Sequence, residues 1–190
     1  MPFNLSKQDS GIKDYMKLVE EAREFSRKAH EGQKRKYHGE EYFVHPERVA
    51  KVAQELDLPY QYVMAAYLHD TVEDTTVTIE EVKQRFGEEV ANHVNWLTNP
   101  SKKFPNLKRD ERKKMDREHL AMAPDQVKIL KALDRIDNVK DMVMADPGFK
   151  KKYANESLLL AEALVAGQPS ETLVKLVNEL KALATNLATS

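Results

Sequence analysis

The chain has 190 residues, of which 30 are Lys or Arg and 31 are Asp or Glu, so its formal net charge is −1. A net charge near zero gives no global field that would favour nucleic acid or an anionic membrane as a partner. The absence of cysteine excludes disulfides and thiolate metal sites, so any metal has to be held by His, Asp, Glu or water. One domain is expected at this length, and we find no apolar run long enough to span a bilayer. With no signal peptide, a cytoplasmic location is the default.

Apolar residues recur every three or four positions through most of the chain, a spacing that is typical of amphipathic helices. We therefore predict an all-α fold, a compact multi-helix bundle with at most a minimal β-hairpin near residues 35–44. Residues 1–12 are expected to be a frayed start. In chain order, helices are predicted over about residues 14–31, 45–56, 59–70, 78–86, 90–97, 108–119, 124–138, 154–166 and 170–187.

The last predicted helix has a narrow stripe of leucine and valine side chains between Leu173 and Leu187. Such a stripe could pack against the core of the same chain or against a second copy. Packing within the chain is the stronger expectation, and a homo-oligomer is the alternative.

The third predicted helix ends in residues that can bind metal or transfer protons. The apolar stretch 63–68 is followed at once by His69 and Asp70, and then by Glu73 and Asp74. Charge beside an apolar helix is costly to bury unless it is paired or bound to a metal. A His-Asp pair offers one nitrogen and one oxygen ligand. Because such pairs often occur by accident, the prediction of a site here depends on what else can reach it.

Two further candidate ligands lie elsewhere in the chain. His45 begins the second predicted helix, and Asp134 lies beside the apolar stripe of a later one. An unpaired carboxylate would be costly there, so Asp134 requires either Arg135 or a metal as its partner, and the upstream ligands favour the metal. A helical bundle could assemble a mixed nitrogen and oxygen site that suits Mn²⁺, Fe²⁺ or Zn²⁺ better than Ca²⁺ and leaves positions for water and substrate. The candidate ligands are His45, His69, Asp70 and Asp134.

Four other segments each allow a structural and a functional interpretation. Glu73 and Asp74 could activate a water, or they could be surface acids at a helix end. The loop around Arg35 and Lys36 could clamp a phosphate or nucleotide, or it could be a solvated turn. Residues 99–107 are rich in turn formers and form either a connector or a lid. Residues 108–119 are densely charged, which favours a helix with a solvated face.

Taken together, these residues resemble the HD-domain hydrolase module of the RelA/SpoT family. The likeness is greatest to its stand-alone small alarmone hydrolases, which include the metazoan SpoT homologue. It extends over about residues 15–165 by eye, and the combination is specific although no single segment is. In order, the matching segments are Ala29–Gln33 with Arg35 and Lys36, Tyr42–Pro46, His69–Thr75 and Lys131–Asn138.

This resemblance implies an all-helical HD phosphohydrolase domain over residues 1–190, with a catalytic core at about 15–165 and a C-terminal helix at about 170–187. It implies Mn²⁺-dependent removal of the 3′-pyrophosphate of (p)ppGpp, a small nucleotide, with neither nucleic acid nor membrane as a partner. Carried over by position, it implies the metal ligands His45, His69, Asp70 and Asp134 and the water-activating pair Glu73 and Asp74. It implies the substrate contacts Arg35, Lys36, Lys131, Arg135 and Asn138. Because the sequence ends soon after the last helix, hydrolysis without synthesis is expected.

The chain departs from the family pattern in three places. The stretch between Lys36 and Gly39 is one residue longer, Glu41 stands where Pro is usual, and Asp137 stands where an aromatic residue or His is usual. A carboxylate near a polyanionic substrate is unexpected, so Asp137 leaves the nucleotide open. The alternatives are a nucleoside monophosphate, NADPH or (p)ppApp. A non-catalytic alarmone sensor is a further alternative, although the complete set of candidate metal and water-activating residues argues against it.

Overall fold

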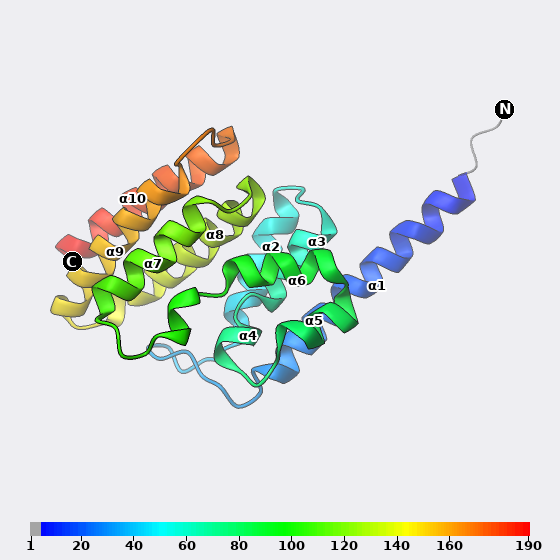
Figure 1. The fold of residues 1–190 in the computed structure, drawn as a ribbon, viewed down its shortest axis with the longest axis horizontal. Helices are drawn as coiled ribbons and strands as arrows, with labels where there is room; N and C mark the ends of the chain where they lie inside the picture. The colour runs from blue at the N-terminus through cyan, green and yellow to red at the C-terminus, as the bar shows by residue number, and fades with distance from the viewer. Residues whose placement is uncertain (1–4) are drawn as a thin grey trace.

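The computed structural model describes the backbone of residues 5–190 and the side chains from Asp14 onward. This part of the chain is built from helices joined by short loops (Figure 1), so the predicted all-α bundle is confirmed. None of its helices is both long and apolar enough to cross a membrane. The helices are α1 (Leu5–Ala29), α2 (Val44–Glu55), α3 (Tyr60–Leu68), α4 (Thr71–Asp74), α5 (Ile79–Phe86), α6 (Glu88–Leu97), η1 (Pro100–Lys103), α7 (Arg109–Ala121), α8 (Asp125–Asp141), η2 (Met142–Met144), α9 (Pro147–Leu164) and α10 (Glu171–Thr189).

The first helix is longer than the sequence pattern indicates. It begins at Leu5, so the predicted start at Asp14 is wrong, and so is the predicted frayed start for residues 5–12. Residues 1–4 lie outside the described part of the chain. Apolar spacing detects a helix through its buried stripe, and residues 6–10 are mostly polar. Figure 1 shows this end of α1 projecting beyond the other helices.

The segment between α1 and α2 does not form the predicted hairpin. Among residues 5–190, its pairing amounts to one isolated antiparallel bridge between Lys34 and Glu41 and no strand. The chain reverses at Gly39, whose φ of +69° lies in the region that favours glycine. Arg35 donates its backbone N–H to Glu40 at 2.8 Å and so closes the loop next to this turn. Because the turn begins directly after Arg35, no room is left for a longer ladder.

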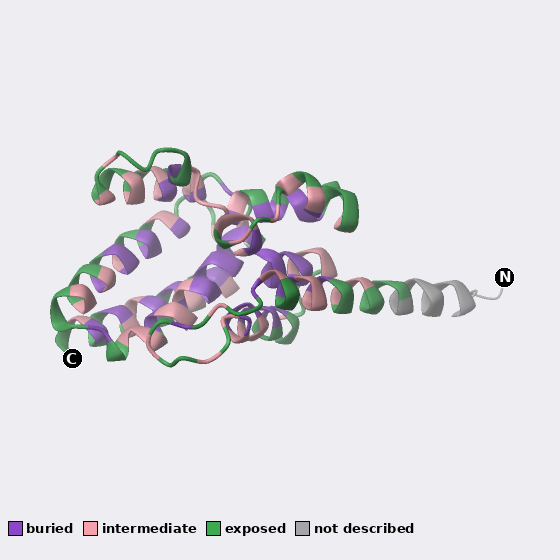
Figure 2. Cartoon of the chain, turned by 90° about the horizontal axis from the view of Figure 1, so that it is seen from below, coloured by how far each residue is buried: buried purple, intermediate pink, exposed green. Residues whose placement is uncertain are grey.

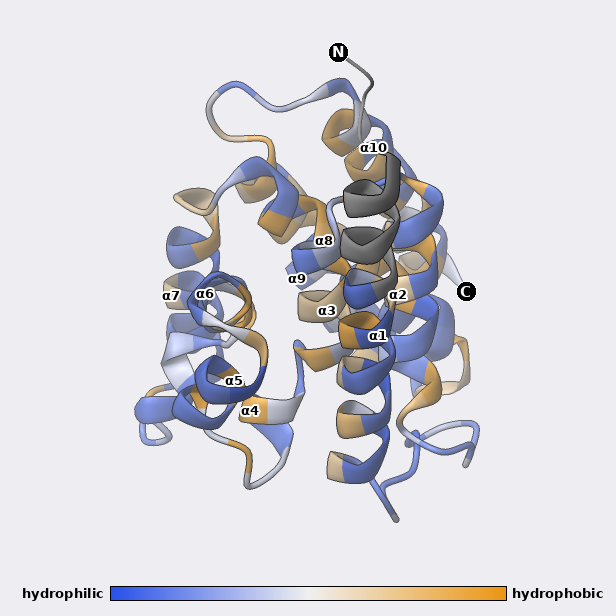
Figure 3. Ribbon diagram, turned by 90° about the vertical axis from the view of Figure 1, so that its right-hand side faces the viewer, coloured by the Kyte–Doolittle hydropathy of each residue, from blue (hydrophilic) through white to orange (hydrophobic). Residues whose placement is uncertain are grey.

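The core is one cluster of buried side chains that extends from α2 and α3 through α8 to α9 and α10. The residues Val63–Leu68 of α3 are all buried, since this helix packs against α1, α2 and α6. Figure 2 shows buried residues concentrated on the central helices. Figure 3 shows hydrophobic residues on the inward faces of the helices and hydrophilic ones on the outer faces. The apolar periodicity therefore predicts the inward faces correctly.

The last helix packs within the chain, as expected. The side chains of Leu173, Val177, Leu180 and Leu187 are buried, and α10 lies against α8 and α9. The side chain of Ser170 accepts a hydrogen bond from the backbone N–H of Leu173 at 3.2 Å, which caps the helix. The stripe thus belongs to the core of this chain.

Three helices meet where the candidate ligands lie. His45 is in the first turn of α2, His69 follows the end of α3, and Asp134 lies in the middle of α8. The hydroxyl of Thr71 donates to the carbonyl of Leu68 at 2.7 Å, which stabilises the bend between α3 and α4. This bend directs His69 and Asp70 towards α8.

Candidate metal and catalytic centre

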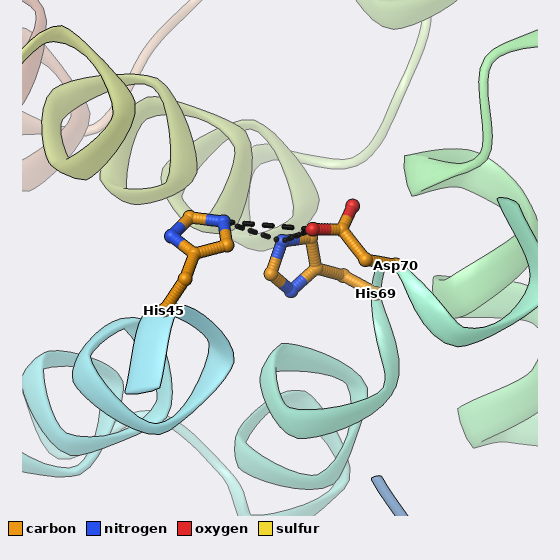
Figure 4. Close-up of side chains that lie close together, drawn as sticks. All are labelled: His45, His69 and Asp70. Atoms are coloured by element: carbon orange, nitrogen blue, oxygen red, sulfur yellow. Dashed lines mark hydrogen bonds and ion pairs between the residues drawn. The ribbon is translucent and has the colours of Figure 1, made fainter. Parts of the chain in front are cut away.

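Two imidazoles and a carboxylate converge in a buried cluster (Figure 4). The Nε2 atoms of His45 and His69 lie 3.2 Å apart. The Oδ2 atom of Asp70 lies 3.1 Å from His69 Nε2 and 3.5 Å from His45 Nε2. Both imidazoles are almost completely buried, with relative exposures of 0% and 3%. The three ligand atoms lie within 4.8 Å of one another, which suits binding to a single cation.

Asp134 completes the cluster from α8. Its Oδ1 atom lies 3.3 Å from His45 Nε2 and 3.8 Å from His69 Nε2. Its Oδ2 atom pairs with Lys131 Nζ at 2.7 Å. Arg135, the partner considered from sequence, instead lies over the ring of Tyr153, 4.7 Å from the ring centroid. Lys131 is therefore the cationic partner, because a separation of three residues places both side chains on the same face of α8.

In each imidazole, the hydrogen bond made by Nδ1, the outer nitrogen, determines whether Nε2, the inner nitrogen that faces the cluster, has a free lone pair. His69 Nδ1 lies 2.7 Å from the carbonyl oxygen of Ala66, which can only accept, so this nitrogen is the donor. His45 Nδ1 similarly lies 2.7 Å from a carboxylate oxygen of Asp137. In the neutral imidazoles both Nε2 lone pairs therefore face the cluster together with two carboxylates. Such a donor set needs a proton or a cation between its members, and it fits a divalent metal.

The charged groups of the cluster shift one another's pKa values towards the ionised forms. Burial raises the pKa of Asp70, but the adjacent His69 outweighs this effect and the net pKa lies below its usual range. Burial lowers the pKa of His69, yet the charge of Asp70 and the hydrogen bond to it raise the net pKa to about 9. The pKa of Asp134 is also well below its usual range, because Lys131 and the two histidines outweigh burial. The carboxylates are therefore ionised at neutral pH and available to a cation.

The predicted water-activating acids lie on α4, next to this cluster. Glu73 accepts from the side-chain amide of Asn99 at 2.9 and 3.0 Å and from its backbone N–H at 3.1 Å. Burial and the charge of Asp70 raise the pKa of Asp74, while Lys102 opposes the shift. The hydroxyl of Tyr42 donates to Asp70 at 2.7 Å and lies 3.4 Å from Asp74. A carboxyl with a raised pKa beside a candidate metal site is suited to proton transfer.

The predicted nucleotide contacts divide between two cavities. Arg35, Lys36 and Asn138 line a cavity of about 230 Å³ together with Lys34, Tyr37, Tyr42, Asp141, Met142 and Phe149. In it, Arg35 Nη2 donates to Asn138 Oδ1 at 2.9 Å, and Arg35 Nε donates to Asp141 at 2.7 Å. Lys36 Nζ lies 5.8 Å from the ring centroid of Phe149. This cavity combines cationic, amide and aromatic groups.

Lys131 and Arg135 line the second cavity, which is small, at about 20 Å³. Lys113 of α7 lines it too, and burial together with the charges of Arg135 and Lys131 lowers the pKa of Lys113. The expected helix with a solvated face is confirmed, since Asp110, Glu111, Lys114 and Glu118 are exposed, and Lys113 lies on its covered side. Local charge density predicts solvation only where no other element covers the helix, and here α7 packs against α9.

Asp137, the unexpected carboxylate, does not line the 230 Å³ cavity. Its Oδ2 accepts from His45 Nδ1, and its Oδ1 accepts from Arg48 Nε at 2.7 Å. Its Oδ2 also lies 3.9 Å from Nη2 of Arg35, which lines that cavity, so its place relative to the substrate stays a prediction. Asp137 and Asn138 come three and four residues after Asp134, so both lie near its face of α8. Asp137 reaches His45, whereas Asn138 donates to Asp134 and lines the cavity.

Sequence reasoning missed several residues at this centre. Asn99 and Lys102 belong to the 99–107 loop, which forms η1 and contacts both Glu73 and Asp74. The loop is thus more than a connector, and the predicted Asn-Pro turn before η1 was the available signal. Tyr42 belongs to the Tyr42–Pro46 motif, but nothing in that motif indicates the hydrogen bond from its hydroxyl to Asp70. Arg48 had no local signal, since a basic residue on a helix is usually solvated.

The fold and the site define a helical protein with a buried two-histidine, two-aspartate centre. The family model for the HD domain matches residues 22–168, so the chain belongs to the HD-domain family. An HD domain implies a divalent metal, and the His/Asp cluster offers a site for one.

Curated relatives match this same region. The chain is 39% identical over 157 residues to the guanosine-3′,5′-bis(diphosphate) 3′-pyrophosphohydrolase of Aquifex aeolicus, covering 82% of this chain and 22% of the relative. It is 35% identical over 147 residues to the bifunctional (p)ppGpp synthase/hydrolase SpoT of Escherichia coli K12, covering 76% and 21%. The chain therefore spans about a fifth of the length of these relatives.

Solved structures share the fold. One is described as a metazoan ortholog of SpoT that hydrolyses ppGpp and plays a role in starvation responses. It matches with a TM-score of 0.76 at 24% identity, over 86% of this chain and 93% of that one. A Listeria monocytogenes EGD-e protein matches with a TM-score of 0.65 at 25% identity, over 79% and 99%. The first likeness extends over nearly the whole of that protein, and at this identity it is evidence for the fold.

Proposed function

We propose that this protein is a Mn²⁺-dependent (p)ppGpp 3′-pyrophosphohydrolase, which converts (p)ppGpp to GDP or GTP and pyrophosphate. The observation that supports this most strongly is the convergence of His45, His69, Asp70 and Asp134 beside the acids Glu73 and Asp74. The names of the curated relatives support the choice of substrate. The mixed nitrogen and oxygen donor set is compatible with Mn²⁺.

The four ligands would hold the cation on the inner side of α4. The chemistry that a divalent cation supplies in such a site is activation of a water and neutralisation of phosphoryl charge. Tyr42 orients Asp70 through the hydrogen bond to Oδ2, and Lys131 balances the charge of Asp134. These contacts hold the carboxylates in place before a substrate arrives, so little reorganisation is needed.

Glu73 and Asp74 would orient the water and transfer the protons of the reaction. The water oxygen forms a bond to the phosphorus attached to the ribose 3′-oxygen, and the bond between that phosphorus and the 3′-oxygen breaks. The water gives up a proton, and the departing 3′-oxygen takes one. Glu73, fixed by Asn99, is placed to orient the water, and Asp74, whose pKa is raised, is suited to exchange the proton.

The 230 Å³ cavity would receive the nucleotide. Arg35 offers a planar guanidinium that can stack on a base or bind phosphate, and Asn138 offers an amide for hydrogen bonding. Lys36, which also lines the cavity, adds a further cation. Lys131 and Arg135 lie on the other side of Asp134, where their charge would offset that of the phosphates.

The test is a chromatographic assay of purified protein with ppGpp, with and without Mn²⁺, that follows GDP and pyrophosphate. Mn²⁺-dependent formation of both products, lost in Asp70→Ala with unchanged circular dichroism, is the expected result. A panel of nucleoside monophosphates, NADPH and ppApp in the same buffer measures specificity. If ppGpp is bound but not converted while Mn²⁺ is bound, the protein is a sensor, and conversion of another nucleotide alone would reassign the substrate.

A further inference from the structure

The carboxylate of Asp137 is shared between a candidate metal ligand and an arginine. Its Oδ2 lies 2.7 Å from His45 Nδ1, and its Oδ1 accepts from Arg48 Nε at 2.7 Å. Arg48 Nη2 adds a second contact to Oδ2 at 3.1 Å. The carboxylate is thus held by a two-point arginine contact while it accepts from the imidazole. Such a paired geometry fixes the position and orientation of the carboxylate.

Helical spacing explains why these four groups meet. His45 and Arg48 are three residues apart on α2, and Asp134 and Asp137 are three residues apart on α8. Residues with this separation share a face, and α2 packs directly against α8. Asp134 therefore meets the inner nitrogen of His45 while Asp137 meets the outer one. Both ring nitrogens of His45 therefore contact carboxylates of the same helix, α8.

The two imidazoles of the centre are held in different ways. His69 Nδ1 donates to a backbone carbonyl of its own helix, that of Ala66. His45 Nδ1 donates to a carboxylate of another helix, so its orientation depends on a side chain that substitution can remove. An anionic acceptor also increases the electron density at the inner nitrogen of the ring, which makes that nitrogen a stronger ligand.

We propose that Asp137 is a positioning residue for the metal centre: it holds His45 as the tautomer protonated at Nδ1 and directs Nε2 to the cation. Arg48 assists by fixing Asp137, and Arg48 Nη1 is itself bound to Glu40 of the preceding loop at 2.9 Å. This inference rests on the metal site of the proposed function and is independent of its substrate. The residue that departs from the family pattern is thereby assigned to the metal rather than to the nucleotide.

The test compares Asp137→Asn with Asp141→Asn. Asp141 lies one turn further along the same face of α8 and is equally covered, with 13% of its side chain exposed against 15% for Asp137. Its carboxylate binds Arg35 and lies 3.8 Å from Arg48. The Asp141→Asn substitution therefore removes the same charge as Asp137→Asn but removes no contact to His45. The dissociation constant of Mn²⁺ is measured for the full chain by electron paramagnetic resonance, without nucleotide.

We expect Asp137→Asn to weaken Mn²⁺ binding about 10- to 100-fold, and Asp141→Asn to change it less than roughly threefold, because only the first variant alters the acceptor of a ligand. In the ppGpp assay, Asp137→Asn should raise the Mn²⁺ concentration at half-maximal rate by the same factor, while the KM for nucleotide at saturating Mn²⁺ stays unchanged. Recovery of turnover by added Mn²⁺ is a result that a general folding defect would not give.

Equal Mn²⁺ affinity in wild type and Asp137→Asn would overturn the proposal, and so would an equal loss in both variants, which would indicate a charge effect alone. If Asp137→Asn does not fold, Arg48→Gln takes its place, and an unchanged Mn²⁺ affinity in that variant overturns the proposal as well. A protein that binds Mn²⁺ in this Asp137-dependent way but leaves ppGpp intact would contradict the proposed function only.

Discussion

Asn99 donates its side-chain amide to both carboxylate oxygens of Glu73, at 2.9 and 3.0 Å, and its backbone N–H to one of them. The same segment reaches the neighbouring acid, since Lys102 Nζ lies 3.3 Å from Asp74. Its other side is anchored to α7, where Ser101 donates to Asp116 at 2.9 Å. The segment that begins with Asn99 therefore ties the two proposed water-activating acids to the outer helices.

Replacing Asn99 tests whether this fixation matters for turnover. Asn99→Ala should lower kcat about tenfold, because Glu73 loses the donors that orient it and small misplacements of a reacting group are costly. Mn²⁺ affinity should stay unchanged, since no metal ligand contacts Asn99. Steady-state kinetics with ppGpp measure the effect. Lys103→Ala, an exposed change in η1, is the control and should retain wild-type turnover. A normal kcat in Asn99→Ala would mean that Glu73 is positioned without it.

Lys131 and Lys128 provide a matched test of the buried ion pair. Lys131 Nζ pairs with Asp134 at 2.7 Å, whereas Lys128 Nζ donates to the carbonyl of Ala166 at 3.1 Å, and both side chains are buried on α8. Without metal, Lys131→Met should lower the free energy of unfolding by about 3 kcal/mol, because Asp134 loses its nearest cation. Lys128→Met should cost about 1 kcal/mol.

The metal dependence separates these two lysine variants. Mn²⁺ should recover part of the loss in Lys131→Met, because a cation beside Asp134 replaces the missing charge, and should give Lys128→Met no recovery beyond the general stabilisation by ligand. Urea unfolding with and without Mn²⁺ measures both. Identical losses of unfolding free energy in the two variants would show that the pair of Lys131 with Asp134 stabilises the fold no more than the hydrogen bond of Lys128 does.

Arg35 tests the proposed nucleotide cavity. Arg35→Gln should raise the KM for ppGpp about tenfold or more, since the cavity loses its buried guanidinium and the bidentate or stacked contact that it offers. The Mn²⁺ dissociation constant should stay within experimental error. Arg27→Gln is the control, because Arg27 pairs with Glu24 on the exposed surface of α1, does not line the cavity and should leave the KM unchanged. An unchanged KM in Arg35→Gln would exclude this cavity as the nucleotide site.

The raised pKa of His69 predicts how the metal-free protein responds to pH. Burial lowers this pKa, but Asp70 and Asp134 raise it to about 9, above the ordinary value of 6.5. The folded state therefore binds the proton more tightly than the unfolded state. The resulting stabilisation is fully present below pH 6.5 and is lost as the pH rises through about 9.

Urea unfolding of the metal-free protein between pH 6 and pH 9.5 measures this dependence. Stability should fall across the window, and the fall should be smaller in His69→Gln, which cannot take up the proton. A flat profile in the wild type would contradict the raised pKa. Excess Mn²⁺ should remove most of the slope, because the cation takes the place of the proton in the cluster.

Much of this centre could be predicted from the residues alone. The abrupt change from the apolar run 63–68 to His69 and Asp70 indicates a site, and His45 and Asp134 are further candidate ligands. The structure brings all four together. The start of the first helix was less predictable, because residues 6–10 are mostly polar and leave no apolar periodicity to detect.

What the sequence determines by itself is the kind of chemistry available: helical periodicity, an absence of thiolates, and four candidate nitrogen and oxygen ligands on three predicted helices. What only the tertiary structure decides is the partner of each polar group. Asp134 pairs with Lys131 rather than Arg135, Asp137 meets His45 and Arg48 of another helix, and Asn99 meets Glu73 across 26 positions of sequence. Hydrogen bonds act over about 3 Å, so their partners depend on how the helices pack, which local pattern does not specify.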